Sequence, residues 1–108
     1  MKRAVLLLAI VGCKPTGTTS TEGAQIFAAY CTQCHGPYGR PPADMIARFK
    51  VRDLTDPAFR TTLTAAAVDK QVRNGSENKL MPAFSDRLSD QQITALAQWV
   101  ASPAFVTR

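Results

Sequence analysis

The sequence contains few side chains that bind metals or transfer protons. It has one histidine and three cysteines in 108 residues, and Cys13 falls in a separate N-terminal segment. Three ligands of these types remain, whereas a structural zinc site uses four, usually as two pairs. The scarcity argues against a zinc-binding module. The carboxylates, such as Asp53 and Asp56, show no pairing that would indicate general acid–base catalysis.

A strong excess of basic charge is also missing. The formal net charge is +5, but without Lys2 and Arg3 of the N-terminal segment eleven basic residues face eight acidic ones, a net charge of +3. No run of basic residues and no interleaving of basic with aromatic residues accompanies this mild excess. We therefore expect no nucleic-acid partner.

No apolar run is long enough to cross a membrane. The run at 4–11 has eight residues, whereas a membrane-spanning helix takes about 20. A short apolar run after Lys2 and Arg3 is typical of a secretory signal. The run ends in the tetrapeptide IVGC at 10–13, which resembles the lipobox of bacterial lipoproteins with isoleucine where leucine is usual.

The lipobox resemblance implies a signal peptide at 1–12, cleavage before Cys13 and lipidation of that cysteine. Two or more acyl chains would anchor the protein stably. Residues 13–21 then form a flexible tether, rich in hydroxyl side chains, that holds a domain at 22–108 off the membrane. These features place the protein in the periplasm or on the outer face of a bacterial membrane. The alternative is a plain export signal followed by an incidental cysteine.

The rest of the chain shows no alternation of apolar and polar residues, so we expect an all-α fold. A first helix should begin near Ser20, where Thr19 and Glu22 have the spacing of a capping box, and run into the stretch 31–35. Glycine and proline dominate 36–57, which predicts a loop with at most a short helix at 44–49.

Three further helical segments are expected in the second half of the chain. A short one follows Asp56-Pro57 and ends at Leu63, and Thr64 should cap a helix that ends before Gly75. The last is the clearest, because Ser89 and Gln92 form a capping box and an apolar stripe follows. Pro103 should end it.

Residues 31–35 read CTQCH. At helical spacing Cys31, Cys34 and His35 share one face, so two thiols and one imidazole point to the same side. Covalent haem requires this arrangement, since the sulfurs add to two vinyl groups and the imidazole ligates the iron. C-x-x-C-H is the attachment motif of c-type haem. We therefore expect one haem c, held by Cys31 and Cys34, with His35 as an axial iron ligand.

Other interpretations of the motif remain open. A thioredoxin-like redox pair would need a βαβ context, which the chain lacks. A Cys31–Cys34 disulfide without haem is the plainest alternative, because exported thiols tend to oxidise.

The second axial ligand should come from far along the chain. The only histidine is already used, so methionine is the natural candidate. Met81 precedes Pro82 in a loop between two predicted helices, where its thioether can be held rigidly. Met45 is the rival, but it lies within the short helix expected at 44–49. We predict that Met81 ligates the iron.

Taken in order along 22–102, these features resemble the class I c-type cytochromes, in particular the small bacterial monohaem members. The resemblance rests on Gly23 with Phe27, on the CTQCHG stretch, on the MPAF loop and on the C-terminal helix LSDQQITALAQWVA. It implies an all-α fold wrapped round the haem. The N- and C-terminal helices should cross closely, with Gly23 and Phe27 near Leu96 and Trp99.

The resemblance also implies two further contacts of the haem site. A proline carbonyl should accept a hydrogen bond from the iron-ligating histidine, and Pro41 and Pro42 are the two candidates. Arg40 sits where many members place a basic residue that binds a haem propionate; a solvated arginine is the alternative.

Histidine and methionine ligation predicts a one-electron carrier and not an enzyme. The thioether is a weak donor and raises the reduction potential, and with both axial positions filled the iron excludes small ligands. The expected partners are redox proteins. The basic residues Lys50, Arg52, Lys79 and Arg87 would steer an acidic one, or are a scatter of solvated charges. The alternatives are a haem-binding subunit of a respiratory or oxidising complex, or a haem enzyme or sensor with a labile sixth ligand.

Overall fold

The computed structural model describes residues 17–108, and this part of the chain is helical with no strand. The predicted all-α class is therefore confirmed. The helices, in order, are α1 (Gly23–Tyr30), α2 (Thr32–His35), α3 (Ala43–Phe49), α4 (Pro57–Thr62), α5 (Ala65–Asn74), α6 (Asp90–Ala101) and α7 (Ala104–Thr107).

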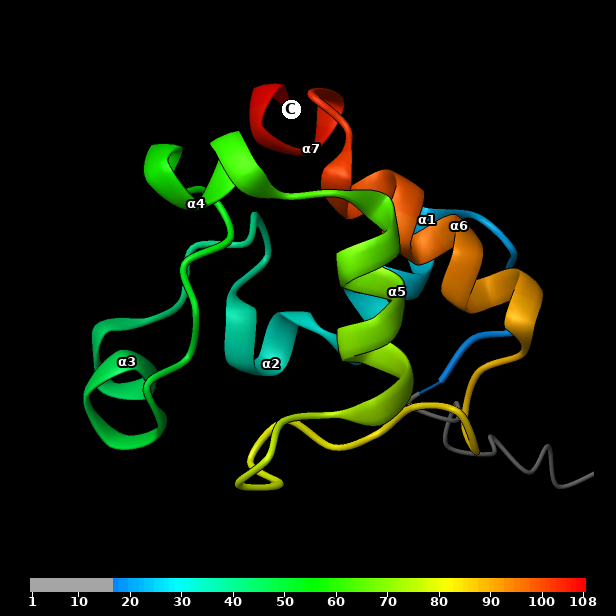
Figure 1. Cartoon of the computed structure of the whole chain (residues 1–108), viewed down its shortest axis with the longest axis horizontal. Coiled ribbons are helices and arrows are strands. Elements are labelled where there is room, and N and C mark those ends of the chain that lie inside the picture. Colours follow the sequence, from blue (N-terminus) through cyan, green and yellow to red (C-terminus); the bar gives the residue numbers. More distant parts are fainter. Residues whose placement is uncertain (1–16) are drawn as a thin grey trace, which may run out of the picture.

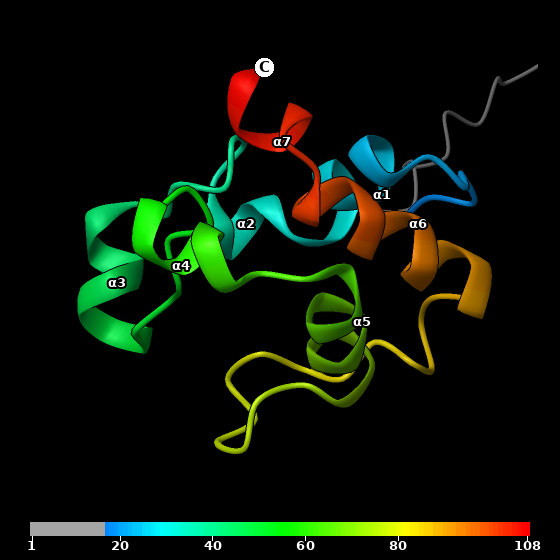
Figure 2. The same cartoon turned by 45° about the horizontal axis from the view of Figure 1, so that its top comes forward.

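The core forms around α6, which packs against α1, α5 and α7. Helices α2, α3 and α4 lie on one side of α5, and α1 and α6 lie on the other (Figures 1 and 2). The loop after α5 first extends toward the side of α2 and α3 and then crosses back past α5 to α6. The apolar stripe of α6 supplies Ile93, Leu96, Ala97 and Val100 to the core. The three longer helices α1, α5 and α6 thus form a packed scaffold, which supports the segments that contain the candidate site residues.

Helices α5 and α6 begin where their predicted caps place them. Ser89 and Gln92 form the predicted capping box of α6: the Ser89 hydroxyl accepts from the Gln92 backbone, and the Gln92 side chain accepts from the Ser89 N–H. Thr64 caps α5 by accepting from the Ala67 N–H at 3.1 Å, and α5 ends before Gly75 as expected. These helix starts follow from local hydrogen bonding alone.

Helix α1 crosses α6 at Gly23, as the resemblance implied. A Cβ on Gly23 would lie 2.5 Å from the Ala95 carbonyl oxygen and would also collide with the Trp99 side chain. The beginning of this helix was predicted wrongly. It starts at Gly23 with Glu22 as N-cap and no side-chain cap, and the Thr19–Glu22 capping box does not form. The Ser20 hydroxyl instead accepts from the Glu22 N–H at 3.0 Å.

The C-terminal helix α7 was not predicted, because Pro103 was interpreted only as the end of α6. Proline is compatible with the start of a helix, and Pro103 is the N-cap of α7. Phe105 on α7 is fully buried and makes an edge contact with Phe27, the ring centroids being 5.1 Å apart. α7 therefore closes the core over the crossing of α1 and α6.

The segment before α1 is held against the domain. The Gln92 side chain donates to the carbonyls of Thr18 at 3.1 Å and Ser20 at 2.9 Å. Thr18 and Ser20 are therefore held by α6, although both fall within the predicted tether at 13–21. The predicted signal peptide at 1–12 and the lipidation site Cys13 lie outside the described residues. Among residues 17–108 no helix has the length and apolar character needed to cross a bilayer.

Candidate functional site

The cysteine motif lies at the junction of α1 and α2. Cys31 is both the last cap of α1 and the first cap of α2, and the backbone stays helical across it. The Cys31 N–H donates to Phe27 and the His35 N–H donates to the Cys31 carbonyl, each at 2.9 Å. The predicted single helix is therefore two helices with a bend at Cys31, and the helical spacing of the three site residues is kept.

Glycine ends the motif helix for a steric reason. Gly36 has a φ of 77°, a conformation that L side chains rarely adopt, and a Cβ there would collide with the Arg40 carbonyl. The chain can therefore turn sharply just after His35.

The structure joins Cys31 and Cys34 by no disulfide bond. Burial, and to a lesser degree the neighbouring Cys34, raises the pKa of the Cys31 thiol to about 12. Reactive redox cysteines instead have lowered pKa values. Cys31 stays a neutral thiol at pH 7, which argues against a thioredoxin-like pair and leaves the sulfur available for a covalent group.

The imidazole of His35 is oriented by the backbone carbonyl of Arg52, at 3.1 Å from Nδ1. A carbonyl only accepts, so Nδ1 carries the proton and the Nε2 atom of a neutral ring has a free lone pair. Burial lowers the pKa of His35, although the bond to Arg52 opposes this, and the ring therefore stays neutral at pH 7. A neutral imidazole with a free nitrogen is what iron ligation requires.

The expectation of a proline carbonyl was wrong: neither Pro41 nor Pro42 accepts from His35. After α3 the chain reverses at Lys50, which has a left-handed φ of 53°, and residues 51–55 return along the motif. The Leu54 N–H donates to the Gly39 carbonyl at 2.8 Å and fixes this return. The reversal brings Arg52, rather than a proline, to the imidazole.

A turn secures the residues just after Arg52. One carboxylate oxygen of Asp53 accepts from the Thr55 N–H at 2.9 Å and from the Thr55 hydroxyl at 2.6 Å. Burial raises the pKa of Asp53, but the two bonds from Thr55 and the charge of Arg40 outweigh it and lower the pKa below its usual value. Asp53 is therefore ionised at neutral pH and is a strong acceptor in this turn.

Met81 lies in the predicted loop between α5 and α6, half-buried against the core. The Met81 carbonyl accepts from the Ser76 N–H at 2.9 Å, and the Met81 N–H donates to the Ser76 hydroxyl at 3.0 Å. Asn78 bonds the same hydroxyl at 2.7 Å and the Leu80 N–H at 3.0 Å. The backbone of Met81 is thus fixed by side chains that the sequence interpretation missed, although Ser and Asn near a glycine are a turn signal.

The rival Met45 lies on α3, which ends with Lys50 in the left-handed conformation. No residue of α3 is buried. The helix therefore provides less support for a fixed ligand than the hydrogen-bonded loop around Met81 does, and Met81 as the ligand stays a prediction.

The side chains around the motif fit a large apolar group. Ile46 and Phe49 on α3 are 44% and 43% exposed, and Leu80, next to Met81, is 53% exposed. Helices α2, α3 and α4 contain no buried residue. Polypeptide this poor in protein contacts needs another surface to pack on, and a planar apolar cofactor held at the motif provides one.

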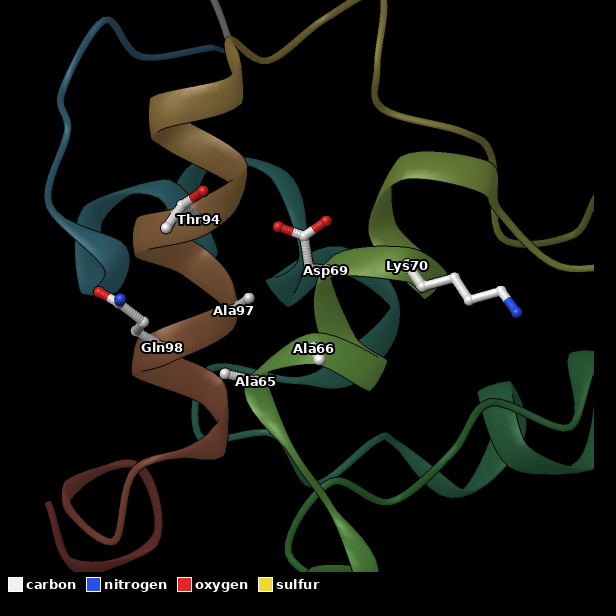
Figure 3. A pocket seen from close by; sticks show the side chains of 7 residues that line it. All are labelled: Ala65, Ala66, Asp69, Lys70, Thr94, Ala97 and Gln98. Carbon is white, nitrogen blue, oxygen red and sulfur yellow. The ribbon is translucent and has the colours of Figure 1, made fainter.

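A shallow groove between α5 and α6 is a separate feature. It is lined by three alanines on facing helices together with polar side chains (Figure 3), namely Ala65, Ala66, Asp69, Lys70, Thr94, Ala97 and Gln98. None of these is a cysteine, histidine or methionine, so the groove does not belong to the candidate site. The basic residues expected to steer a partner, together with Arg40, are exposed, and their roles stay predictions.

A family model described as "Cytochrome C oxidase, cbb3-type, subunit III" matches residues 18–100. The chain belongs to this family of c-type cytochromes. It is a small class I monohaem cytochrome c with haem c as cofactor, and the expectations for fold and cofactor are confirmed.

Similar proteins of known description are also cytochromes or cytochrome subunits. A cytochrome c6 of Picosynechococcus sp. is 33% identical over 113 residues, covering 94% of this chain and 90% of that protein. The cbb3-type cytochrome c oxidase subunit FixP of Azorhizobium caulinodans is 33% identical over 90 residues, covering 82% of this chain. The chain spans only 29% of the length of FixP.

The fold is also found among solved structures. The KustC0563 c-type cytochrome superposes with a TM-score of 0.65 at 21% identity, covering 74% of this chain and 94% of that one. This likeness shows the fold alone, whereas the family match and the cytochrome c6 relative support an electron carrier.

Proposed function

We propose that this cytochrome is an exported, membrane-anchored one-electron carrier with a single haem c whose iron is ligated by His35 and Met81. The observation that carries the proposal is the orientation of His35. Its Nδ1 donates to the Arg52 carbonyl at 3.1 Å, which directs the lone pair of Nε2 away from this bond. The two free thiols of the motif lie at helical spacing next to this imidazole.

Each residue of the site has a distinct task. Bound haem supplies a one-electron iron couple. Cys31 and Cys34 would hold it covalently, so that it would stay with the chain even if an iron ligand were lost. His35 is kept in one tautomer by Arg52, and second-shell bonds of this kind orient a ligand and raise its basicity. The exposed apolar side chains Ile46 and Phe49 exclude water from one part of the site once they are covered.

Met81 completes the ligation and decides the type of chemistry. A thioether is a weak donor that favours the reduced iron and raises the potential. If His35 and Met81 both ligate the iron, a substrate would find no open position on it, so we expect a carrier and not an enzyme. The Ser76–Asn78 bonds that fix the loop support this role, because a rigid ligand changes little between oxidation states.

Absorption spectra of the exported protein, oxidised and reduced, test this ligation. We expect covalent haem that stays with the chain on a denaturing gel and a weak near-infrared band from methionine ligation in the oxidised form. Haem that acid and acetone extract would refute attachment through Cys31 and Cys34. Attached haem without the band would refute ligation by methionine.

A second candidate function is that of a haem-binding subunit of a respiratory complex. The family description and the match to FixP favour it. Gentle detergent extraction followed by size exclusion separates the two candidates. A free carrier elutes alone, whereas a subunit elutes with its partner chains. In either case the immediate partners are redox proteins.

Lipidation of Cys13 would keep the carrier at a membrane, in the periplasm or on the outer face. The support is the apolar run 4–11 that ends in IVGC. We expect Cys13→Ser to move the protein from the membrane to the soluble exported fraction, because the acceptor of the acyl chains is lost. Mass spectrometry of wild-type protein checks the same point. A soluble wild type with an unmodified Cys13 would contradict the anchor.

A further inference from the structure

The carbonyl that orients His35 belongs to Arg52, a residue without the fixed φ of a proline. An oxygen that must stay at one nitrogen therefore needs support from its neighbours. The Arg52 guanidinium lies over the Phe59 ring, 4.9 Å from its centroid, but the residue is exposed. Exposed stacking of this kind is weak and adjustable, so the support must come chiefly from elsewhere.

The residues that follow Arg52 are much more firmly fixed. One oxygen of Asp53 accepts two hydrogen bonds from Thr55, and both residues are half-buried. The Leu54 N–H bonds the Gly39 carbonyl at 2.8 Å, and the Leu54 carbonyl accepts from Arg60 at 3.3 Å. The return segment, residues 51–55, is thus fixed by hydrogen bonds to Gly39 and Arg60 and within its own turn, all within three residues of the Arg52 carbonyl oxygen.

Peptide geometry transmits this restraint to the oxygen. The Arg52 carbonyl and the Asp53 Cα lie in one rigid plane, so the direction of the oxygen depends on the φ of Asp53 and on the ψ of Arg52. The Thr55 bonds restrict the conformation of Asp53 and hence the orientation of this plane. An Asp53 freed from Thr55 could rotate and carry the oxygen away from Nδ1.

We propose that Asp53 and Thr55 are positioning residues for the axial ligand, holding the Arg52 carbonyl on His35 Nδ1. The inference rests on the proposed ligation of iron by His35. A hydrogen bond from Nδ1 makes the imidazole a better donor and favours oxidised iron. The turn should therefore lower the reduction potential relative to a site in which this bond is loose.

Thr55→Val removes the hydroxyl that donates to Asp53 and keeps nearly the shape of the side chain. Thr55→Ser keeps the hydroxyl. Asp53→Ala removes the acceptor from the other side of the same turn. Asp56→Ala is the matched control, since Asp56 accepts a similar turn bond from the Phe59 N–H at 3.2 Å but does not adjoin Arg52. Each variant is compared as the haem-loaded, full-length protein.

Two readouts report on the bond itself. Exchange of the His35 Nδ1 proton with solvent, followed by NMR in the reduced protein, should be roughly tenfold faster in Thr55→Val and Asp53→Ala, as expected for loss of about one hydrogen bond. The reduction potential should rise in the same two variants. Thr55→Ser and Asp56→Ala should match the wild type. The double variant should shift no further than the larger single effect, because both changes break one turn.

The failures of the two proposals are distinguishable. Wild-type protein without covalent haem, or without histidine ligation, would refute the proposed function. With haem attached in every variant, unchanged exchange and potential in Thr55→Val and Asp53→Ala would refute the positioning role alone. Shifts of equal size in Asp56→Ala would also overturn it, since general loosening of the loop would then explain them.

Discussion

Arg60 shows how one side chain joins parts of the fold that no local pattern connects. Its guanidinium donates to the carbonyls of Val100 at 2.7 Å and Ser102 at 3.0 Å, at the end of α6, and to that of Leu54 at 3.3 Å. It also lies 5.3 Å from the centroid of the Phe105 ring. Carbonyls at a helix end lack partners within the helix, and a cation satisfies them well. Arg60 therefore links the return segment, α6 and α7.

The site residues differ in how far the sequence reveals them. Cys31, Cys34 and His35 are predictable because helical spacing alone places them on one face, and the structure keeps that spacing. The carbonyl of Arg52 was not predictable. It is a backbone group, identical in every residue, and the reversal at Lys50 that brings it to His35 depends on a left-handed residue that is not glycine.

At this scale we predict that Met81→Ala leaves haem attached, because Met81 takes no part in the thioether bonds. It should abolish the near-infrared band, lower the reduction potential and open the iron to small ligands such as cyanide. Spectra and redox titration measure all three. Met45→Ala is the matched control, a methionine on α3 that should leave the band in place. Loss of the band in Met45→Ala but not in Met81→Ala would show that the ligand was assigned wrongly.

Among the elements, the crossing of α1 and α6 is the contact most sensitive to side-chain size. Gly23 brings the backbone of α1 close to Ala95 and Trp99 of α6, and α7 covers the same region through Phe105 and Phe27. Closely packed protein interiors do not accept an added methyl group unless the neighbouring atoms move.

We predict that Gly23→Ala lowers the free energy of unfolding by about 1–3 kcal/mol, the usual effect of overpacking. Gly23 is the first residue of α1, so the gain in helix propensity should not offset the collision. Chemical denaturation of the haem-loaded protein measures the change. Gln25→Ala, on the exposed side of the same helix, should stay within about 0.5 kcal/mol of wild type. Equal stability of Gly23→Ala and wild type would mean that the helices can separate freely.

Elements with strong local signals were predicted closely, and those that depend on distant contacts were not. Helices α5 and α6 have side-chain caps, and their starts agree with the sequence. Helix α1 has no side-chain cap, and its start was displaced. Helix α7 has four residues and is stabilised by the burial of Phe105, a contact that no local pattern shows.

On the scale of the whole molecule, the polypeptide forms one core around α6, and the helices α2, α3 and α4 pack poorly against it. The largest fully buried side chains are Phe27, Phe105, Ile26, Ile93 and Leu96, all on α1, α6 or α7. Helices α2, α3 and α4 bury none of their residues. A domain of this size buries a modest core, so we expect haem c to add to its stability as well as to carry the electron.

This division predicts how the protein responds when haem cannot attach. Cys31→Ala with Cys34→Ala should give an exported protein whose segment 43–49 is cut first in limited proteolysis, because this segment, helix α3, buries none of its residues. Peptide mapping by mass spectrometry locates the cuts. Met81→Ala, which keeps the thioether bonds, is the control and should remain resistant over the same digestion. If the haem-free variant resists protease as well as the wild type does, α3 folds without the cofactor. In that case the exposed Ile46 and Phe49 serve some other surface than the haem.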